Sequence, residues 1–298
     1  MILIAGGTGR MGQQVVCRLA GRGLAVRILT RDPAHAQLLR SRFPELVEIA
    51  LGDVRDAATV EWAAAGAHTV VSAMHGFAGA GVSPRTVDWQ GNRNLIQAAG
   101  RGGAEHFILL SILQAGPDHP IELFRMKYRA EQDLRASALA WTIIRPSAFM
   151  ELWAEIIGAP LVKTGRTRLF GRGANPINFV SATDVARCVE LAVVDPAPRG
   201  AVVEIGGPQN ITFRQFAQTF QAESGKAGSV SHVPLPVLRL MSVLMRPVNP
   251  SLARKIQASI VMDTHDMTFD ASEFQRHYPS ISLSSLAEVV KRDYAVSA

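Results

Sequence analysis

The N-terminal stretch Met1-Ile2-Leu3-Ile4-Ala5-Gly6-Gly7-Thr8-Gly9-Arg10-Met11-Gly12 decides the fold. An apolar run typical of a buried strand leads into a glycine turn, and the turn leads into the helical pattern of residues 13–19. Glycine lets the backbone turn tightly, bring its N–H groups against a phosphate, and pack the following helix close to the strand. The stretch therefore predicts a dinucleotide pyrophosphate site, formed by Gly6, Thr8, Gly9, Arg10, Met11 and Gly12.

The end of the second apolar run, residues 24–31, bears on the choice of cofactor. An NAD site normally has an acidic residue there that binds the ribose 2′-hydroxyl, but this chain has Arg31. A guanidinium matches the oxygens of a 2′-phosphate, so the sequence predicts NADP(H), with an ordinary surface charge as the alternative. Asp32 precedes Pro33 and a helical pattern, which predicts a helix cap rather than a ribose ligand.

Length and composition are those of a packed globular protein. The 298 residues are 48% hydrophobic and 19% charged, and the net charge of +6 is scattered, without the basic run typical of nucleic-acid binding. Cys17 and Cys188 lie far apart, and no targeting segment precedes the first strand, so we expect free thiols and a cytoplasmic protein. The apolar stretch 233–248 is interrupted by Arg239, Arg246 and three prolines, so no membrane span is expected.

Apolar runs of strand length alternate with helical patterns through the first half of the chain. This order predicts an α/β fold with a doubly wound parallel sheet, that is, a Rossmann fold. After Pro146 the rhythm changes to loops around 158–176, fewer strands and several helices. We predict an NADP-binding domain at 1–150, to which 177–195 return, and a smaller, mostly helical substrate domain at 151–176 and 196–298. Further strands are expected at 47–51, 68–74, 106–111, 141–145 and 201–205, and helices at 56–65, 85–101, 121–138, 212–224, 235–245, 250–260 and 283–294.

One predicted helix of the smaller domain carries an apolar stripe of Leu238, Leu240, Met241, Leu244 and Met245. Apolar periodicity mostly reports burial, so core packing or the seam of a homodimer is the expected explanation. The wall of a substrate pocket is the alternative.

Several ordered segments resemble the atypical extended short-chain dehydrogenase/reductases, and among them the NmrA-like group. The resemblance covers residues 1 to about 225. It rests on the glycine turn, Thr30-Arg31-Asp32, Leu51-Gly52-Asp53-Val54, Asp88-Trp89-Gln90-Gly91-Asn92-Arg93-Asn94-Leu95, Lys127 with Glu131 and Leu134, Trp141 to Pro146, and Gly206 to Thr212. It implies that Asp53 and Val54 lie near the adenine, and that Ala73, Met74, Lys127 and Pro146 contact other parts of the cofactor.

Catalysis in this family usually depends on a serine and a Tyr-x-x-x-Lys motif. The resemblance assigns these catalytic roles to Ser111 and Lys127, but Leu123 stands four residues before Lys127 and cannot transfer a proton. The neighbouring Tyr128 points about 100° away around the helix. Lys127 is predicted to contact the ribose or to stabilise developing charge on the substrate, with a solvated helix charge as the alternative.

Two loop histidines, His75 and His119, are weaker catalytic candidates. The histidines and cysteines show no metal-ligand spacing, so no metal site is expected. Because NADPH carries the hydride itself, acceptors that need little help from a proton donor remain suitable substrates. Two functions are therefore weighed: an NADPH-dependent reductase of a small apolar carbonyl, quinone or enone, and a non-catalytic NADP(H)-binding sensor or assembly factor.

Overall fold

The structure is a computed structural model that describes residues 1–77 and 81–294. The chain divides into two compact units. The first comprises Met1–Arg145 and Val185–Glu204, and the second Pro146–Asp184 and Ile205–Ala298.

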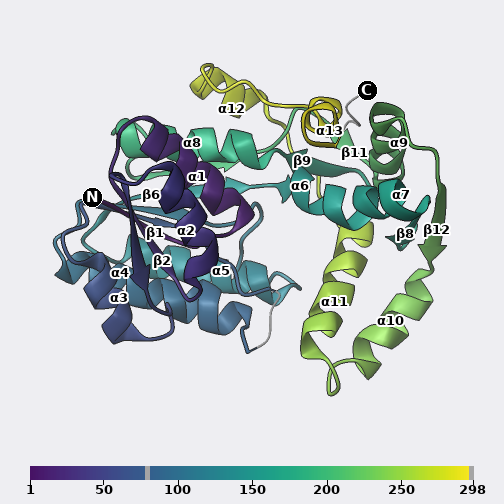
Figure 1. Ribbon diagram of the computed structural model, residues 1–298. Helices are drawn as coiled ribbons and strands as arrows, with labels where there is room; N and C mark the ends of the chain where they lie inside the picture. Colours follow the sequence, from purple (N-terminus) through teal and green to yellow (C-terminus); the bar gives the residue numbers. More distant parts are fainter. Residues whose placement is uncertain (78–80, 295–298) are drawn as a thin grey trace. The chain divides into compact units, whose positions relative to one another are not determined.

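A seven-stranded sheet forms the centre of the first unit, in the order β10-β6-β5-β4-β1-β2-β3 (Figure 1). The pairs from β3 through β6 are parallel. The central strands are buried on both faces, which explains why their sequences read as continuous apolar runs rather than alternating ones. The strands are β1 (Ile2–Ala5), β2 (Val26–Thr30), β3 (Val47–Leu51), β4 (Thr69–Ser72), β5 (His106–Leu110), β6 (Ala140–Pro146) and β10 (Ala201–Ile205).

Helices cover both faces of this sheet, as the predicted Rossmann fold requires. The helices α3, α4 and α5 share a core with β1, β4 and β5, while α1 and α8 lie on the opposite face (Figure 1). Glu190 of α8 forms ion pairs with Arg18 of α1 and with Arg22, which follows that helix. The helices are α1 (Arg10–Gly21), α2 (Pro33–Arg42), α3 (Ala57–Ala64), the π-helical segment η1 (Arg85–Gly91), α4 (Asn92–Arg101), α5 (Glu122–Arg135) and α8 (Ala182–Val194).

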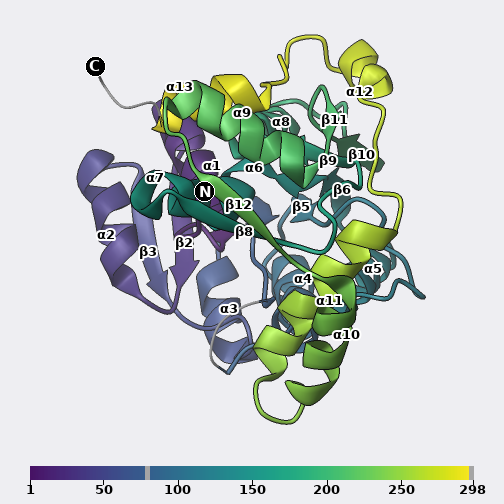
Figure 2. The ribbon, with the colours of Figure 1, turned by 90° about the vertical axis from the view of Figure 1, so that its right-hand side faces the viewer.

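The second unit has two small sheets and a core rich in phenylalanine. Its β7, β9 and β11 form one sheet and β8 pairs with β12, with the helices of the unit around them (Figure 2). Phe179, Phe216 and Phe220 are fully buried in its core. The strands are β7 (Ala148–Phe149), β8 (Arg166–Phe170), β9 (Ile177–Val180), β11 (Asn210–Ile211) and β12 (Ser229–Val233). The helical segments are α6 (Met150–Trp153), η2 (Ala154–Gly158), α7 (Ala159–Thr164), α9 (Phe213–Ser224), α10 (Leu235–Leu244), α11 (Pro250–Thr264), α12 (Ser272–His277) and α13 (Leu286–Tyr294).

The division into units differs from the predicted domain boundaries at two strands. Residues 177–180, expected to return to the large sheet, pair as β9 with β7 and β11 of the second unit. Residues 201–205, expected in the smaller domain, form β10 beside β6 in the large sheet. Both strands are short apolar runs, and such a run specifies a buried strand without specifying which sheet it joins.

Residues 158–164 were expected to be loop, and they form a helix instead. Pro160 stands in the first turn of α7, where proline starts a helix rather than breaking one. Gly165 then adopts a positive φ of 67° and ends the helix. Residues 166–170, also expected to be loop, form β8.

Candidate functional site

The glycine turn between β1 and α1 leaves no room for a side chain at Gly6 or Gly12. A Cβ atom at Gly12 would lie 2.1 Å from the carbonyl oxygen of Gly6, and one at Gly6 would lie 2.7 Å from that of Ala73. Gly6 also has a φ of 84°, which favours glycine. The backbone of the turn therefore packs directly against the start of α1 and the segment after β4.

The N-terminus of α1 is suited to an anion. Its N-cap is Gly9, which has no side chain to cap the helix, and its first turn contains no acidic residue. The first N–H groups of a helix lack partners within it and lie at the positive end of its dipole. These features fit a dinucleotide pyrophosphate. Of the predicted residues, Thr8 lies in the glycine turn, and Arg10 and Met11 begin α1.

Arg31 lies immediately after β2 and is exposed. Its neighbours have other tasks. The Asp32 carboxylate accepts a hydrogen bond from Ala34 N at 2.9 Å and so caps α2, as predicted. The Thr30 hydroxyl donates to the Asp32 carbonyl oxygen at 2.8 Å. Arg31 is thus the charged side chain of this segment that is not used in capping, and its role toward a 2′-phosphate stays a prediction.

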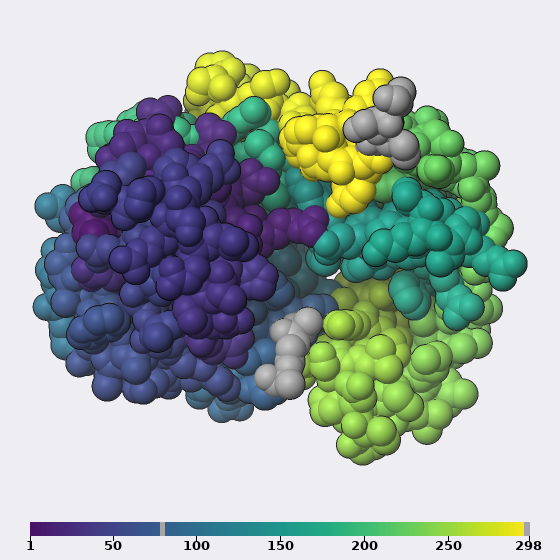
Figure 3. All heavy atoms as spheres, viewed as in Figure 1, coloured from purple at the N-terminus to yellow at the C-terminus, as the bar shows by residue number. Residues whose placement is uncertain are grey.

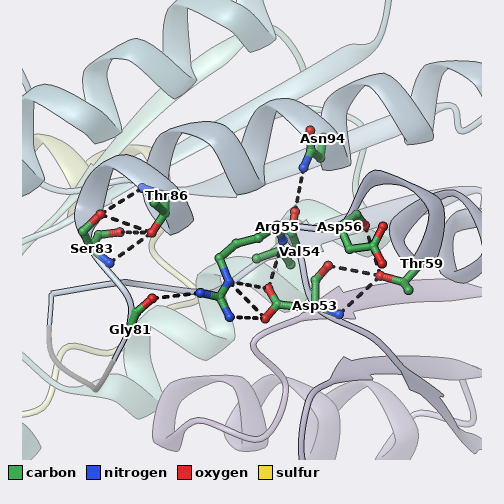
Figure 4. Close-up of polar contacts among 9 residues, drawn as sticks. All are labelled: Asp53, Val54, Arg55, Asp56, Thr59, Gly81, Ser83, Thr86 and Asn94. Carbon is green, nitrogen blue, oxygen red and sulfur yellow. Dashed lines mark hydrogen bonds and ion pairs between the residues drawn. The ribbon is translucent and has the colours of Figure 1, made fainter.

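Asp53, at the end of β3, is held by an arginine that the sequence reasoning did not single out (Figure 4). Arg55 donates to both carboxylate oxygens of Asp53, with Nη2 2.6 Å from Oδ2, and to the carbonyl oxygen of Gly81 at 2.8 Å. The hydrogen bond from Arg55 is the main reason that the pKa of Asp53 lies below its usual value, and Arg31 contributes at longer range. The carboxylate is therefore fixed in its charged form close to Arg31.

Val54 is fixed by its backbone. Its carbonyl oxygen accepts a hydrogen bond from Asn94 Nδ2 of α4 at 2.9 Å. This bond ties the segment after β3 to the helix that follows β4. The roles of Asp53 and Val54 toward adenine stay predictions.

Lys127 of α5 is 4% exposed, so its interpretation as a solvated helix charge is wrong. Its Nζ donates to the carbonyl oxygens of Met74 at 2.9 Å and Leu110 at 2.8 Å, at the carboxyl ends of β4 and β5. It also lies 3.1 Å from Oδ1 of the fully buried Asp88. The other oxygen of Asp88 accepts a hydrogen bond from Gly76 N at 2.7 Å. The ammonium group is thus a fixed buried cation at the edge of the sheet where cofactors bind.

The sequence reasoning gave Asp88 no role of its own. It lies within η1, in a segment that the sequence presents as part of one continuous helix from 85 to 101. The π-helical geometry is accompanied by a hydrogen bond from Asn92 Nδ2 to the Asp88 carbonyl oxygen at 2.7 Å, and the Ser72 hydroxyl donates to Asn92 Oδ1 at 2.6 Å. Such segments often occur at functional sites.

Ser111, the second predicted catalytic residue, belongs to a different network. Its hydroxyl donates to Glu131 of α5, and it is 6% exposed. Glu131 is fully buried and accepts from Arg145, whose Nη2 lies 2.6 Å from Oε2. Ser111 is therefore tied to α5 through Glu131, whereas the side chain of Lys127 ties α5 to the ends of β4 and β5. The catalytic roles of both stay predictions.

The remaining candidates differ in what surrounds them. His119 stacks on Phe124 with ring centroids 3.9 Å apart, and its Nδ1 accepts a hydrogen bond from Ile121 N, so it has a local packing role. His75 is exposed after β4. Although the residue keeps an exposed surface, the protein around its ring lowers the pKa of His75 by desolvation; Asp88 opposes this shift and the charge of Lys127 adds to it. Leu123 is half-buried on α5.

Two other predicted cofactor contacts lie at strand ends. Ala73 follows β4, where its N–H donates to the Ala5 carbonyl oxygen at 2.8 Å, and Pro146 is the last residue of β6.

Cys17 and Cys188 are free, and burial raises the pKa of Cys188 to about 12. Across residues 1–77 and 81–294, no group of three or more His, Cys, Asp or Glu side chains is placed to hold a metal ion. In the same part of the chain, the helices are too short or too polar to cross a bilayer.

The chain is similar to known proteins in sequence and in fold. It is 29% identical over 227 residues to an NAD(P)H azoreductase of Xenophilus azovorans, covering 76% of this chain and 74% of that protein. It is 27% identical over 245 residues to a photosystem II assembly factor of Synechocystis, covering 82% of this chain and 74% of the factor.

Among solved structures, an NADPH-dependent quinone oxidoreductase from Escherichia coli in complex with NADPH has the same fold. The TM-score is 0.77 at 21% identity, and the match covers 98% of this chain and 99% of the oxidoreductase. A family model described as NAD(P)H-binding matches residues 6–196, which include the glycine turn, Arg31 and Lys127. The chain therefore belongs to the NAD(P)H-binding family of Rossmann-fold proteins.

Proposed function

We propose that the chain is an NADPH-dependent reductase of a small apolar carbonyl, quinone or enone compound. The observation that carries this proposal is the side-chain-free turn of Gly6, Gly9 and Gly12 with an exposed arginine, Arg31, at the end of the neighbouring strand. The turn suits a pyrophosphate, and the arginine suits the 2′-phosphate that distinguishes NADP from NAD.

The residues of α5 favour one class of electron acceptor. NADPH supplies the hydride when it is bound. The position four residues before Lys127 holds Leu123, which has no proton to give. Lys127 is held in place by three oxygen atoms, so its charge is pre-positioned to stabilise negative charge that develops on a reduced acceptor. Conjugated acceptors delocalise that charge and need the least protonation, and the names of the azoreductase and the quinone oxidoreductase support this class.

A specific observation also favours a second function, that of an NADP(H)-binding sensor or assembly factor without catalysis. The Lys127 ammonium group and the Ser111 hydroxyl both have partners inside the fold, so neither needs a substrate to satisfy it. The relative that is named as a photosystem II assembly factor supports this alternative.

Oxidation of NADPH with a panel of quinones, azo dyes, enones and aldehydes would decide between the two. The reductase proposal expects turnover with at least one conjugated acceptor, and none in a Gly9→Val variant that cannot bind the cofactor. Leu123→Tyr would place a phenol one helical turn before Lys127 and extend activity to aldehydes. If titration shows NADPH binding while neither protein oxidises it with any acceptor, the sensor function replaces the reductase.

A further inference from the structure

The hairpin of α10 and α11 exposes large apolar side chains around its tip. The exposed fractions are 76% for Val248, 61% for Leu240, 59% for Val243 and 55% for Leu244. Of the predicted stripe, Leu238 is fully buried and Met245 is half-buried, so core packing does not explain the exposed Leu240, Met241 and Leu244. The hairpin projects from the body of the second unit in the ribbon and in the space-filling view (Figures 1 and 3).

The two helices do not need these exposed side chains to pair with each other. The two helices contact each other, and Leu238 of α10 and Ala253 and Ile256 of α11 are their buried side chains. Asn249 caps α11 by accepting a hydrogen bond from Leu252 N at 3.0 Å. The tip is thus an ordered turn that presents Leu244, Val248 and the 37%-exposed Leu252 to the outside.

The charge of this segment has a single sign. The stretch from Gly225 to Met262 contains no Asp or Glu, although the whole chain has 25. It contains five basic residues: Lys226, Arg239, Arg246, Arg254 and Lys255. Arg239, Arg246 and Lys255 are exposed on the hairpin. A convex, apolar tip surrounded by positive charge is complementary to a surface that is apolar inside and negative outside.

We propose that the tip of the α10–α11 hairpin docks on an anionic lipid surface. Leu244, Val248 and Leu252 would enter the boundary between headgroups and acyl chains, and the long side chains of Arg239, Arg246 and Lys255 would reach the lipid phosphates. α10 has ten residues, which is about half of what a membrane span requires, so the hairpin lies at the surface.

The charge also argues against a second copy of this chain as the occupant. In a two-fold symmetric dimer the same patch faces itself, which would bring the basic residues of both copies together without acidic partners. An acidic protein groove fits less well than lipid. Viewed down the axis of α10, the exposed apolar side chains lie in an arc that runs from Val243 around to Met241 and covers almost half of the helix circumference. A helix that binds in a protein groove typically presents a narrower stripe.

Co-sedimentation with vesicles tests the proposal. The full chain is mixed with vesicles of phosphatidylcholine alone or of phosphatidylcholine with phosphatidylglycerol. We expect binding to the anionic vesicles that weakens with salt. Leu244→Ser with Val248→Ser, and separately Arg239→Glu with Arg246→Glu, should each reduce binding about tenfold or more. These side chains are exposed, so the variants should fold, which circular dichroism would check.

Two matched controls lie outside the hairpin. Leu38→Ser removes a leucine that is 72% exposed on α2, and Lys163→Glu with Arg166→Glu reverses two exposed charges of the second unit. Both controls should retain vesicle binding. If the wild type ignores anionic vesicles, or if the controls lose binding as strongly as the hairpin variants, the proposal fails.

Light scattering would detect the alternative occupant. A wild-type dimer that Leu244→Ser with Val248→Ser converts to a monomer would make the tip a self-interface and overturn docking on lipid. NADPH oxidation measured without vesicles is independent of these results, so failure of the lipid proposal and failure of the reductase proposal can be told apart.

Discussion

Arg31 is the residue on which the choice of cofactor depends. Arg31→Asp replaces a cation that can pair with the 2′-phosphate by an anion that repels it. Charge-assisted hydrogen bonds contribute about 1.5–3 kcal/mol, so NADPH affinity should fall roughly ten- to a hundredfold while NADH affinity holds or rises. Calorimetric titration of both cofactors checks this. Arg40→Asp, at an exposed arginine of α2, is the control and should leave the ratio unchanged. Equal affinities in the wild type would contradict the prediction.

Lys127 and Asp88 form a buried pair whose members depend on each other. Lys127→Ala removes two hydrogen bonds and leaves the fully buried Asp88 carboxylate without its cation. We expect a loss of about 3–5 kcal/mol in the free energy of unfolding, measured with urea, and partial recovery in Lys127→Met combined with Asp88→Asn. Lys163→Met, at an exposed lysine of α7, should change little. If Lys127→Ala were as stable as the wild type, the lysine would face solvent. Only in that case could the effect of the substitution on turnover be interpreted without a correction for lost stability.

At the scale of elements, the close contact between α1 and the glycine turn predicts different effects for substitutions at Gly9, Gly12 and Gly21. Gly12→Ala would place a Cβ 2.1 Å from the Gly6 carbonyl oxygen, so the turn must distort and the melting temperature should fall. Gly21→Ala, on the same helix, meets nothing within 4 Å and should be neutral or stabilising by up to about 1 kcal/mol. Gly9→Val should remain folded, because Gly9 has a negative φ of −72° that valine can adopt. It should lose NADPH binding, because the added side chain would obstruct the approach of the pyrophosphate. A stable Gly12→Ala that still binds NADPH would contradict the packing argument.

An element could be predicted from the sequence where local residue patterns determine it, and could not where contacts with distant residues determine it. The strands and helices of the first unit were predictable because long runs with one period and clear punctuation define them, such as Asp32-Pro33 at the start of α2. The partner sheet of β9 could not be predicted, because the pairing of a short buried run depends on distant residues. The same holds for Asp88, since only the folded chain brings η1 next to Lys127. Local pattern therefore predicted the glycine turn and Arg31, whereas the buried ion pair required the structure.

At the scale of the whole molecule, the candidate site and the groups that govern stability at low pH lie at opposite ends of the large sheet. The glycine turn, Lys127 and Asp53 gather at the carboxyl ends of the strands. His106 is the first residue of β5, at the other end, and is 1% exposed. Its Nε2 lies 2.9 Å from the Thr142 hydroxyl, which itself donates to the Pro198 carbonyl oxygen. His106 Nε2 is therefore the donor to the Thr142 hydroxyl. Its buried Nδ1 has no hydrogen-bond partner, so this nitrogen carries no proton and the ring is neutral.

This arrangement predicts a loss of stability in mild acid. Desolvation, aided by the charge of Arg199, lowers the pKa of His106 to about 4 from a value near 6.5 in the unfolded chain. Between these two pH values the unfolded state binds more protons than the folded state. The contribution of His106 to the free energy of unfolding is therefore fully present above pH 6.5 and is lost as the pH drops toward 4. The loss from this residue should be about 3 kcal/mol. His106→Gln retains a donor for Thr142 and cannot titrate, so its unfolding free energy, measured with urea across this pH range, should decline less steeply than that of the wild type. Parallel declines in the two proteins would show that other groups, and not His106, cause the acid sensitivity.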